Sequence, residues 1–278
     1  MKNIDKNKLG IYVWFGYVLP MKEKLKLIRD TGFNSVMIWW GDEFIDIDGD
    51  KYHHPDLVRF YDLYLENFHL PFEKINSIWE DNINGIDVKE MIIKSIKDAS
   101  TYEVPTVVLH LSEGSNHPPI NAIGLKRLNE IIDFAEKYNV NVALENLRKP
   151  ERLLDVFKKI NSDKLCFCYD SGHDNCYNGN IDILNDLGHK LVALHLHDND
   201  GTDDLHRIPG EGVIDWNLVL EKLRRINFNG IFSLEVSQAY PHPKPYETPE
   251  RFLKKAYDSV KKLHDKYYSA LTSNSAIL

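Results

Sequence analysis

Ionisable side chains recur at the ends of apolar segments, and they are of the types that bind metal ions. The intervals from Glu145 to Asp170 and from Asp170 to His195 are both 25 residues. A convergent set of carboxylates and imidazoles suits a divalent cation such as Zn, Mn, Co or Mg, and a bound cation relieves repulsion among the carboxylates. The sequence therefore predicts a metal site built from His69, His110, Glu145, Asp170, His173, His195, Asp204, His206 and Glu235.

The elements that would position these residues alternate along the whole chain, as short β-type apolar runs and amphipathic stretches. We expect strands at residues 9–15, 33–40, 63–69, 104–111, 140–145, 165–169, 191–196 and 231–236. We expect helices at residues 22–30, 55–61, 88–100, 124–138, 151–160, 181–187, 218–226 and 249–265. Such alternation implies parallel strands joined by crossover helices.

Eight strand–helix units within 278 residues favour a (β/α)8 TIM barrel over a doubly wound open sheet. No linker rich in Gly, Ser or Pro divides the chain, so we expect one domain over residues 1–278, with a core at 9–265 and a weakly ordered tail at 268–278. Chemistry in such barrels sits at the carboxyl ends of the strands. The ionisable residues lie at those ends, so the barrel would gather them in one ring.

Composition, charge and missing motifs narrow the functional classes. No GxGxxG follows the first strand and no GxxxxGK[ST] occurs, so we expect no nucleotide cofactor. No apolar run approaches the ~18 residues of a membrane span, and a net charge of −8 disfavours a nucleic-acid partner. The first residues lack an apolar signal region and the three cysteines cannot all pair. We therefore expect a reduced, cytoplasmic protein.

Several other residues give weaker signals. Trp79, in the loop NSIWED, is a candidate wall of a substrate pocket, whereas His53 and His54 precede a proline and are expected to be solvated. Cys166 and Cys168 lack the CxxC spacing of zinc ligands and alternate on one strand face, so we expect them to be small core residues.

Six motifs occur in the order typical of the xylose isomerase-like TIM-barrel superfamily, which the chain resembles over about residues 9–265. They are HLPFEKINSIW, VVLH, LEN, YDSGH, HLHDNDGTDDLHRIPGEGVIDW and SLEV. The superfamily contains sugar phosphate isomerases and epimerases, dehydratase-like lyases, and endonuclease IV of AP endonuclease family 2.

Resemblance to the epimerase-like members implies one metal ion and a small carbohydrate substrate. The four matching metal ligands are Glu145, Asp170, His195 and Glu235. The same two glutamates would be the catalytic acid/base pair, and His173 would touch the substrate. His206 and Arg207 would orient its hydroxyl or phosphate groups, although the basic residue typical of epimerases is not evident in the motif.

Resemblance to the endonuclease IV-like members implies three zinc ions instead. The further ligands would be His69, His110, His173, Asp204 and His206, and all have suitable residue types. Two departures disfavour that activity: the loop GDEFIDIDGDKYHH is acidic, and Phe72 replaces a tyrosine. We therefore expect a metal-dependent isomerase or epimerase that acts on a small sugar, polyol or sugar phosphate through an enediolate. A trinuclear zinc phosphodiester hydrolase and a metal-dependent lyase of the dehydratase type remain the alternatives.

Overall fold

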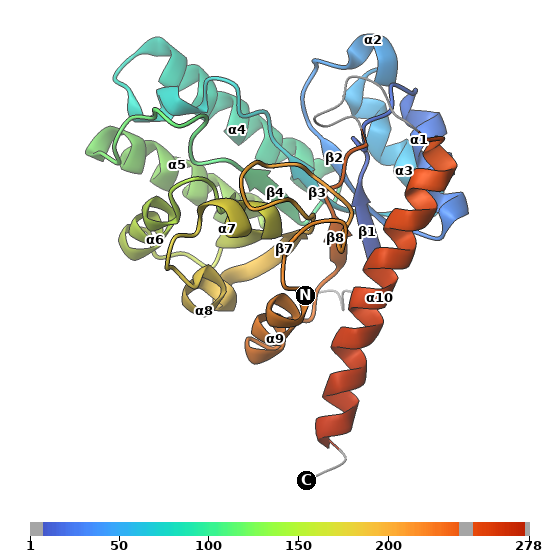
Figure 1. Cartoon of the computed structure of the whole chain (residues 1–278). Helices are drawn as coiled ribbons and strands as arrows, with labels where there is room; N and C mark the ends of the chain where they lie inside the picture. The colour runs from blue at the N-terminus through green and yellow to red at the C-terminus, as the bar shows by residue number, and fades with distance from the viewer. Residues whose placement is uncertain (1–7, 239–246, 276–278) are drawn as a thin grey trace.

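The chain folds into a barrel of parallel strands, seen in a computed structural model that describes residues 8–238 and 247–275 (Figure 1). The sheet order is β7-β6-β5-β4-β3-β2-β1-β8. Its strands are β1 (Leu9–Tyr12), β2 (Ser35–Trp39), β3 (Tyr64–His69), β4 (Thr106–Leu109), β5 (Asn141–Glu145), β6 (Leu165–Asp170), β7 (Leu191–His195) and β8 (Phe232–Leu234). Just past the end of β7, Leu196 closes the circle: its N–H donates to the Ser233 oxygen at 2.9 Å, and its oxygen accepts from the Glu235 N–H at 3.1 Å.

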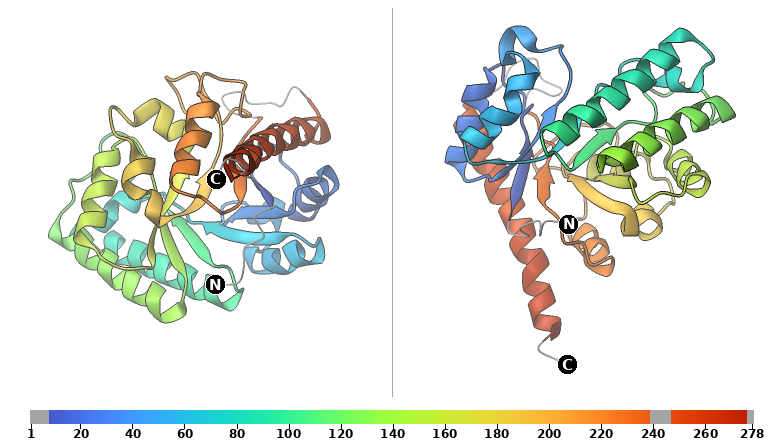
Figure 2. Two further views of the ribbon diagram at one scale, coloured as in Figure 1. Left: turned by 90° about the horizontal axis from the view of Figure 1, so that it is seen from below. Right: turned by 180° about the vertical axis from the view of Figure 1, so that it is seen from behind.

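Helices surround this barrel, as the view along its axis shows (Figure 2). The α-helices among the described residues are α1 (Met21–Thr31), α2 (Ile45–Asp48), α3 (His54–Phe60), α4 (Ile83–Thr101), α5 (Ala122–Tyr138), α6 (Pro150–Lys159), α7 (Ser171–Tyr177), α8 (Ile183–Leu187), α9 (Trp216–Arg225) and α10 (Pro249–Ser275). Short 3-10 turns are η1 (Lys51–His53), η2 (Ile75–Trp79) and η3 (Gly188–Lys190). The predicted single-domain (β/α)8 barrel is confirmed.

Side-chain alternation along the strands explains why ionisable groups gather at one end of the barrel. Small buried side chains from four neighbouring strands form one cluster: Val108, Ala143, Cys166, Cys168 and Ala193. Successive residues of a strand point to opposite faces, so the residue two positions on points the same way. Two positions further along the chain lie His110, Glu145, Asp170 and His195. The small cluster therefore forms the floor beneath a polar ring, and Cys166 and Cys168 are core residues as predicted.

Two helix boundaries differ most from the sequence-based expectation, and the short helices α2 and α7 were not expected. Helix α4 begins at Ile83, because the Asn82 side chain caps it by accepting the Gly85 N–H at 2.9 Å. Helix α10 continues to Ser275, beyond the helix expected at 249–265, and residues 276–278 lie outside the described part. Tyr267 anchors this extension, since it is buried and its hydroxyl donates to the Phe228 oxygen at 2.6 Å.

The length and apolar character of the helices determine whether any of them could cross a membrane. Among the described residues, no helix combines the length and the apolar character needed to cross a membrane. This agrees with the absence of long apolar runs in the sequence.

Candidate metal centre

The nine residues predicted as metal ligands come together at the carboxyl ends of the strands. They form one connected network, in which each member lies within 3.6 Å of another through an imidazole nitrogen and a carboxylate oxygen. Residues from strands that are not neighbours meet here, such as His69 of β3 and Glu145 of β5. The side chains therefore point into the barrel mouth, as the strand pattern predicted.

Glu145 lies at the middle of this network and is almost completely buried. Its Oε2 atom has three imidazole nitrogens around it: His110 Nε2 at 3.3 Å, His195 Nδ1 at 3.3 Å and His69 Nε2 at 3.5 Å. Its Oε1 atom lies 3.2 Å from His173 Nδ1. One carboxylate thus contacts histidines from four places on the barrel, the arrangement expected of a bridging ligand.

A second carboxylate, Asp204, plays a similar part on the loop after β7. Its Oδ2 atom lies 3.1 Å from His173 Nε2 and 3.3 Å from His206 Nε2. The other nitrogen of His206, Nδ1, lies 2.8 Å from the Glu235 backbone oxygen, and donating to it fixes the tautomer that leaves Nε2 facing Asp204. His206 has a φ of 45°, a left-handed backbone conformation that is uncommon outside glycine.

Charge compensation dominates the pKa values in this cluster. Burial alone would raise the pKa of Glu145, but the His195 and His110 imidazoles hold it well below its ordinary value. The pKa of Glu235 falls to about 2 because His195 Nδ1, 2.9 Å away, outweighs the effect of burial. Conversely, burial would lower the pKa of His195, yet its charged neighbours, including Glu235 and Glu145, hold it well above the usual range. The carboxylates are therefore ionised and require a positive charge beside them.

The donor set fits a divalent cation. Glu145, Asp170, His195 and Glu235 each offer one ligand atom, and these atoms lie within 4.8 Å of one another. Glu145 Oε2 and His195 Nε2 are buried without a hydrogen-bond partner among the described residues. Buried polar atoms of this kind are costly unless they are paired, and a cation would pair them. A second potential group is His69, His110 and Glu145, which shares Glu145 with the first.

His197 also belongs to this site, although the sequence analysis did not include it among the site residues. It is 0% exposed, and its Nε2 atom lies 3.0 Å from both carboxylate oxygens of Asp170. The alternation in LHLH, which places residues 195 and 197 on the same side of the chain, was a signal that could have found it.

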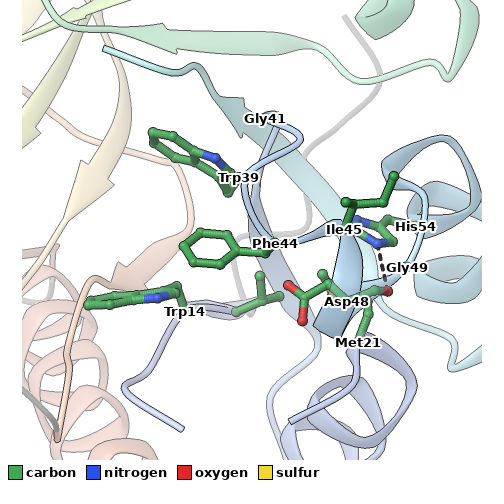
Figure 3. A pocket seen from close by; sticks show the side chains of 10 residues that line it. Trp14, Met21, Trp39, Gly41, Phe44, Ile45, Asp48, Gly49 and His54 are labelled. Carbon is green, nitrogen blue, oxygen red and sulfur yellow. Dashed lines mark hydrogen bonds between the residues drawn. The ribbon is translucent and has the colours of Figure 1, made fainter. Parts of the chain in front are cut away.

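An aromatic cleft opens beside the polar ring (Figure 3). Its lining includes Trp39 at the end of β2, together with Trp14 and Phe44 from the segments that follow β1 and β2. The Trp39 ring stacks on the His69 ring with centroids 5.5 Å apart, so the cleft adjoins the candidate metal ligands. Phe72 stacks on His110 in the same way, with centroids 4.4 Å apart. The mouth therefore has an apolar wall on this side.

Three other expectations need correction or comment. Trp79 is 1% exposed, its Nε1 donates to the Leu111 oxygen at 3.0 Å, and its ring packs against Gly124, so it is a core residue and not a pocket wall.

His54 is buried rather than solvated. Its Nε2 atom lies 3.1 Å from the Asp48 backbone oxygen, and both residues line the aromatic cleft. Arg207 is partly exposed and pairs with Asp200 at 3.7 Å, and its substrate contact stays a prediction.

Comparison with known proteins agrees with this geometry. Residues 25–256 match the family described as xylose isomerase-like TIM barrel. The uncharacterized protein MJ1311 of Methanocaldococcus jannaschii is 30% identical over 213 residues, which cover 69% of this chain and 71% of that protein. An inosose isomerase of Bacillus velezensis is 30% identical over 156 residues, covering 51% of this chain and 54% of the enzyme. The match thus spans about half the length of that isomerase.

Solved structures share the fold. The IOLI protein with a bound zinc atom superposes with a TM-score of 0.76 at 20% identity, covering 94% of this chain and 99% of that one. A D-tagatose 3-epimerase-like protein superposes with a TM-score of 0.75 at 24% identity, covering 95% and 99%. At these identities the superpositions establish a common barrel.

Proposed function

Because the chain belongs to the xylose isomerase-like TIM-barrel family, we propose that it is a metal-dependent isomerase or epimerase of a small sugar or cyclic polyol. The observation that carries the proposal is the buried group of Glu145, Asp170, His195 and Glu235, whose ligand atoms lie within 4.8 Å of one another. The inosose isomerases among its relatives and the zinc in a similar barrel support it.

The proposed reaction is proton transfer at the carbon next to a carbonyl group. A divalent cation, when bound by these four residues, supplies Lewis acidity that stabilises the negative charge of a cis-enediolate. Glu145 and Glu235 both lie close to His195 Nδ1, at 3.3 and 2.9 Å, so the two carboxylates adjoin the same point of the site. Both have lowered pKa values and are ionised at neutral pH. One glutamate would remove the substrate proton, and the other, protonated by solvent, would deliver a proton to the opposite side or to the neighbouring carbon. The first glutamate would then release its proton to solvent.

The remaining side chains of the mouth would bind the substrate. His173 and His206 face the site and would hydrogen-bond hydroxyl groups. Trp39 would pack against C–H groups of the sugar, as aromatic rings do in pockets with a few placed polar groups. Arg148, three residues after Glu145, lies over the Tyr177 ring at 4.3 Å, and the centroid of that ring is 6.0 Å from that of His173, so this basic side chain would bind an acidic substituent.

Deuterium incorporation tests the proposal directly. The substrates to try first are an inosose and the ketohexose D-tagatose, which the relatives suggest. Incubation in heavy water should place deuterium on the carbon next to the carbonyl, because a carboxylic acid exchanges its proton with solvent between turnovers. Product formed without deuterium, or no exchange with any ketose or inosose in the presence of Zn, Mn, Co or Mg, would contradict the proposed chemistry.

A phosphodiester hydrolase with three zinc ions is the second candidate. The observation that favours it is the surplus of donors: His69 and His110 lie beside Glu145, and His173 and His206 lie beside Asp204. Against it, Asp42, Glu43 and Asp46 are exposed next to the aromatic cleft and would repel a phosphate backbone. Metal-dependent incision of a duplex with an abasic site at about 150 mM salt, lost in His69→Ala, would promote this function to first place.

A further inference from the structure

His197 occupies a place in the site that none of the assigned roles explains. It follows His195 by two residues and its ring is completely buried. Its Nε2 atom lies 3.0 Å from Asp170 Oδ1, 3.0 Å from Asp170 Oδ2 and 3.5 Å from Asp204 Oδ1. Since a carboxylate can only accept, the ring must carry its proton on Nε2 and donate it to Asp170.

The surroundings hold this ring in a single orientation. The backbone of His197 is fixed by Ser171, whose Oγ accepts the backbone N–H at 3.0 Å and donates to the backbone oxygen at 2.7 Å. One face of the ring stacks on His206, with centroids 4.3 Å apart and 16° between the planes. A Cβ atom on Gly172 would lie 1.9 Å from His197 Cε1, so a residue with any side chain at position 172 would displace the ring. A core residue that only fills space does not need its ring to be fixed by so many contacts.

The hydrogen bonds of Asp170 indicate the role of the His197 imidazole. Asp170 Oδ1 caps helix α7 by accepting the His173 N–H at 2.6 Å, and it also faces His197 Nε2. The Asp170 backbone is fixed separately, through two reciprocal hydrogen bonds of 2.8 Å with the Asn146 side chain. Oδ2 also faces His197 Nε2 at 3.0 Å but has no second donor among the described residues, so it keeps a lone pair for a cation. Outer hydrogen bonds of this kind orient ligands and raise metal affinity.

We propose that His197 is a positioning residue of the metal centre, which orients the Asp170 carboxylate through its Nε2–H and so raises the affinity for the divalent cation. The inference rests on the metal-binding part of the proposed function, but not on the isomerase chemistry. The alternative is a role as a metal ligand, since His197, His206 and Glu235 also offer ligand atoms within 4.8 Å of one another, and the number of ions bound separates the two roles.

Four variants of the full chain test the proposal. His197→Phe keeps the ring and removes the donor, whereas His197→Gln places an amide N–H near the position of Nε2. His197→Asn carries an amide too short to reach Asp170, and serves if the Phe variant does not fold. His54→Phe is the matched control, since His54 is also buried but belongs to none of the potential metal-binding groups, and within the described part of the chain its hydrogen bond is to the Asp48 backbone oxygen.

The measurement is zinc and cobalt affinity, by competition with a chromophoric chelator, together with the number of ions bound at saturation and the visible spectrum of the cobalt form. We expect His197→Phe and His197→Asn to bind as many ions as the parent protein with about 10- to 100-fold weaker affinity. The visible spectrum of the cobalt form should also change in these two variants. His197→Gln should recover most of the metal affinity, and the affinity of His54→Phe should equal that of the parent protein.

Three results would overturn the inference, each in a different way. Unchanged affinity in both His197→Phe and His197→Asn would show that the Asp170 contact does not position the ligand. Loss of a whole equivalent of metal at saturation would make His197 a ligand. A parent protein that binds no divalent metal would remove the proposed function as well, whereas metal binding without isomerase activity would leave the inference intact.

Discussion

Two buried carboxylates near the barrel mouth, Asp198 and Glu145, differ in how their oxygen atoms are satisfied. Asp198 Oδ1 accepts the N–H groups of Asn199 and Ile214 at 2.9 and 3.1 Å. Its Oδ2 accepts the Gly210 N–H and the Trp216 Nε1–H, both at 2.8 Å. Every donor belongs to the loop that follows β7 or to the start of α9, so Asp198 organises that loop.

Glu145 is equally buried but lacks such partners. The three imidazole nitrogens within 3.5 Å of its Oε2 atom form no hydrogen bond with it, and that oxygen has no other partner among the described residues. Both carboxylates stand in strand-end motifs, so burial and residue type do not separate them. The number of hydrogen-bond donors around the oxygens separates them. Asp198, whose oxygens all have donors, stabilises the structure, whereas Glu145, which lacks donors at Oε2, is available for a ligand.

The largest effect on stability should come from the saturated carboxylate. Asp198→Ala removes four hydrogen bonds to a carboxylate and leaves the Nε1–H of the partly buried Trp216 without this partner. We expect the free energy of unfolding to fall by roughly 4 kcal/mol, as measured by urea denaturation of the metal-free protein. Glu145→Ala should cost far less in the same assay. Equal losses from the two variants would abolish the distinction between the two carboxylates.

For activity, we expect the metal-site glutamates to matter more than the hydrogen-bonded Asp198. Glu145→Gln and Glu235→Gln keep the side-chain size but remove the base, so turnover should drop by about 10²-fold or more. Glu66→Gln is the matched control, because Glu66 is a buried barrel glutamate that bonds Ser233 and belongs to none of the metal-binding groups. Full turnover of the two variants with excess metal would mean that both glutamates only hold the ion.

The unsaturated site should also make the metal-free protein sensitive to pH. Burial would lower the pKa of His206, but Asp204 beside it raises the pKa from 6.5 to about 10. The stability that this group contributes is therefore complete below pH 6.5 and is lost as the pH rises toward 10. For Glu235, whose pKa falls from 4.5 to about 2, the contribution is present above pH 4.5 and is lost as the pH falls toward 2.

Urea denaturation of chelator-treated protein checks this dependence. The free energy of unfolding should be highest between about pH 4.5 and 6.5 and lower at pH 9. His206→Gln should flatten the decline on the alkaline side, and added zinc should oppose it, because deprotonated imidazoles bind the ion. A metal-free protein that becomes more stable between pH 6 and pH 9 would show that protons do not compensate the carboxylates.

The smallest expected effects distinguish two tryptophans, one in the aromatic cleft and one in the core. Trp39 is partly exposed in the aromatic cleft, whereas Trp79 is buried against Gly124. Trp39→Leu should raise KM about 3- to 10-fold with little change in kcat, the pattern of lost ground-state binding. Trp79→Leu should leave KM unchanged and lower the free energy of unfolding by about 2 kcal/mol. Steady-state kinetics and urea denaturation that give the opposite assignment would place the substrate elsewhere.

Sequence patterns predicted the barrel and its nine-residue ring because both depend on short-range regularities. Strand–helix alternation determines the fold, and alternation within a strand places a residue such as Glu145 above Ala143. Predictions failed where a distant contact decides the outcome. Trp79 is buried by helix α5, the end of α10 is fixed by Tyr267, and the importance of His197 depends on space left by Gly172. None of these contacts has a signal within a few residues along the chain.

Metal content of the purified protein tests the central claim most directly, since the unsaturated ring is proposed to hold a divalent cation. Elemental analysis after dialysis against Zn, Mn, Co or Mg should find one tightly bound ion per chain, lost in Glu145→Ala and retained in His53→Ala. Three equivalents of zinc would favour the hydrolase. No retained metal in the parent protein, or full occupancy in Glu145→Ala, would contradict the assignment of this ring as a metal centre.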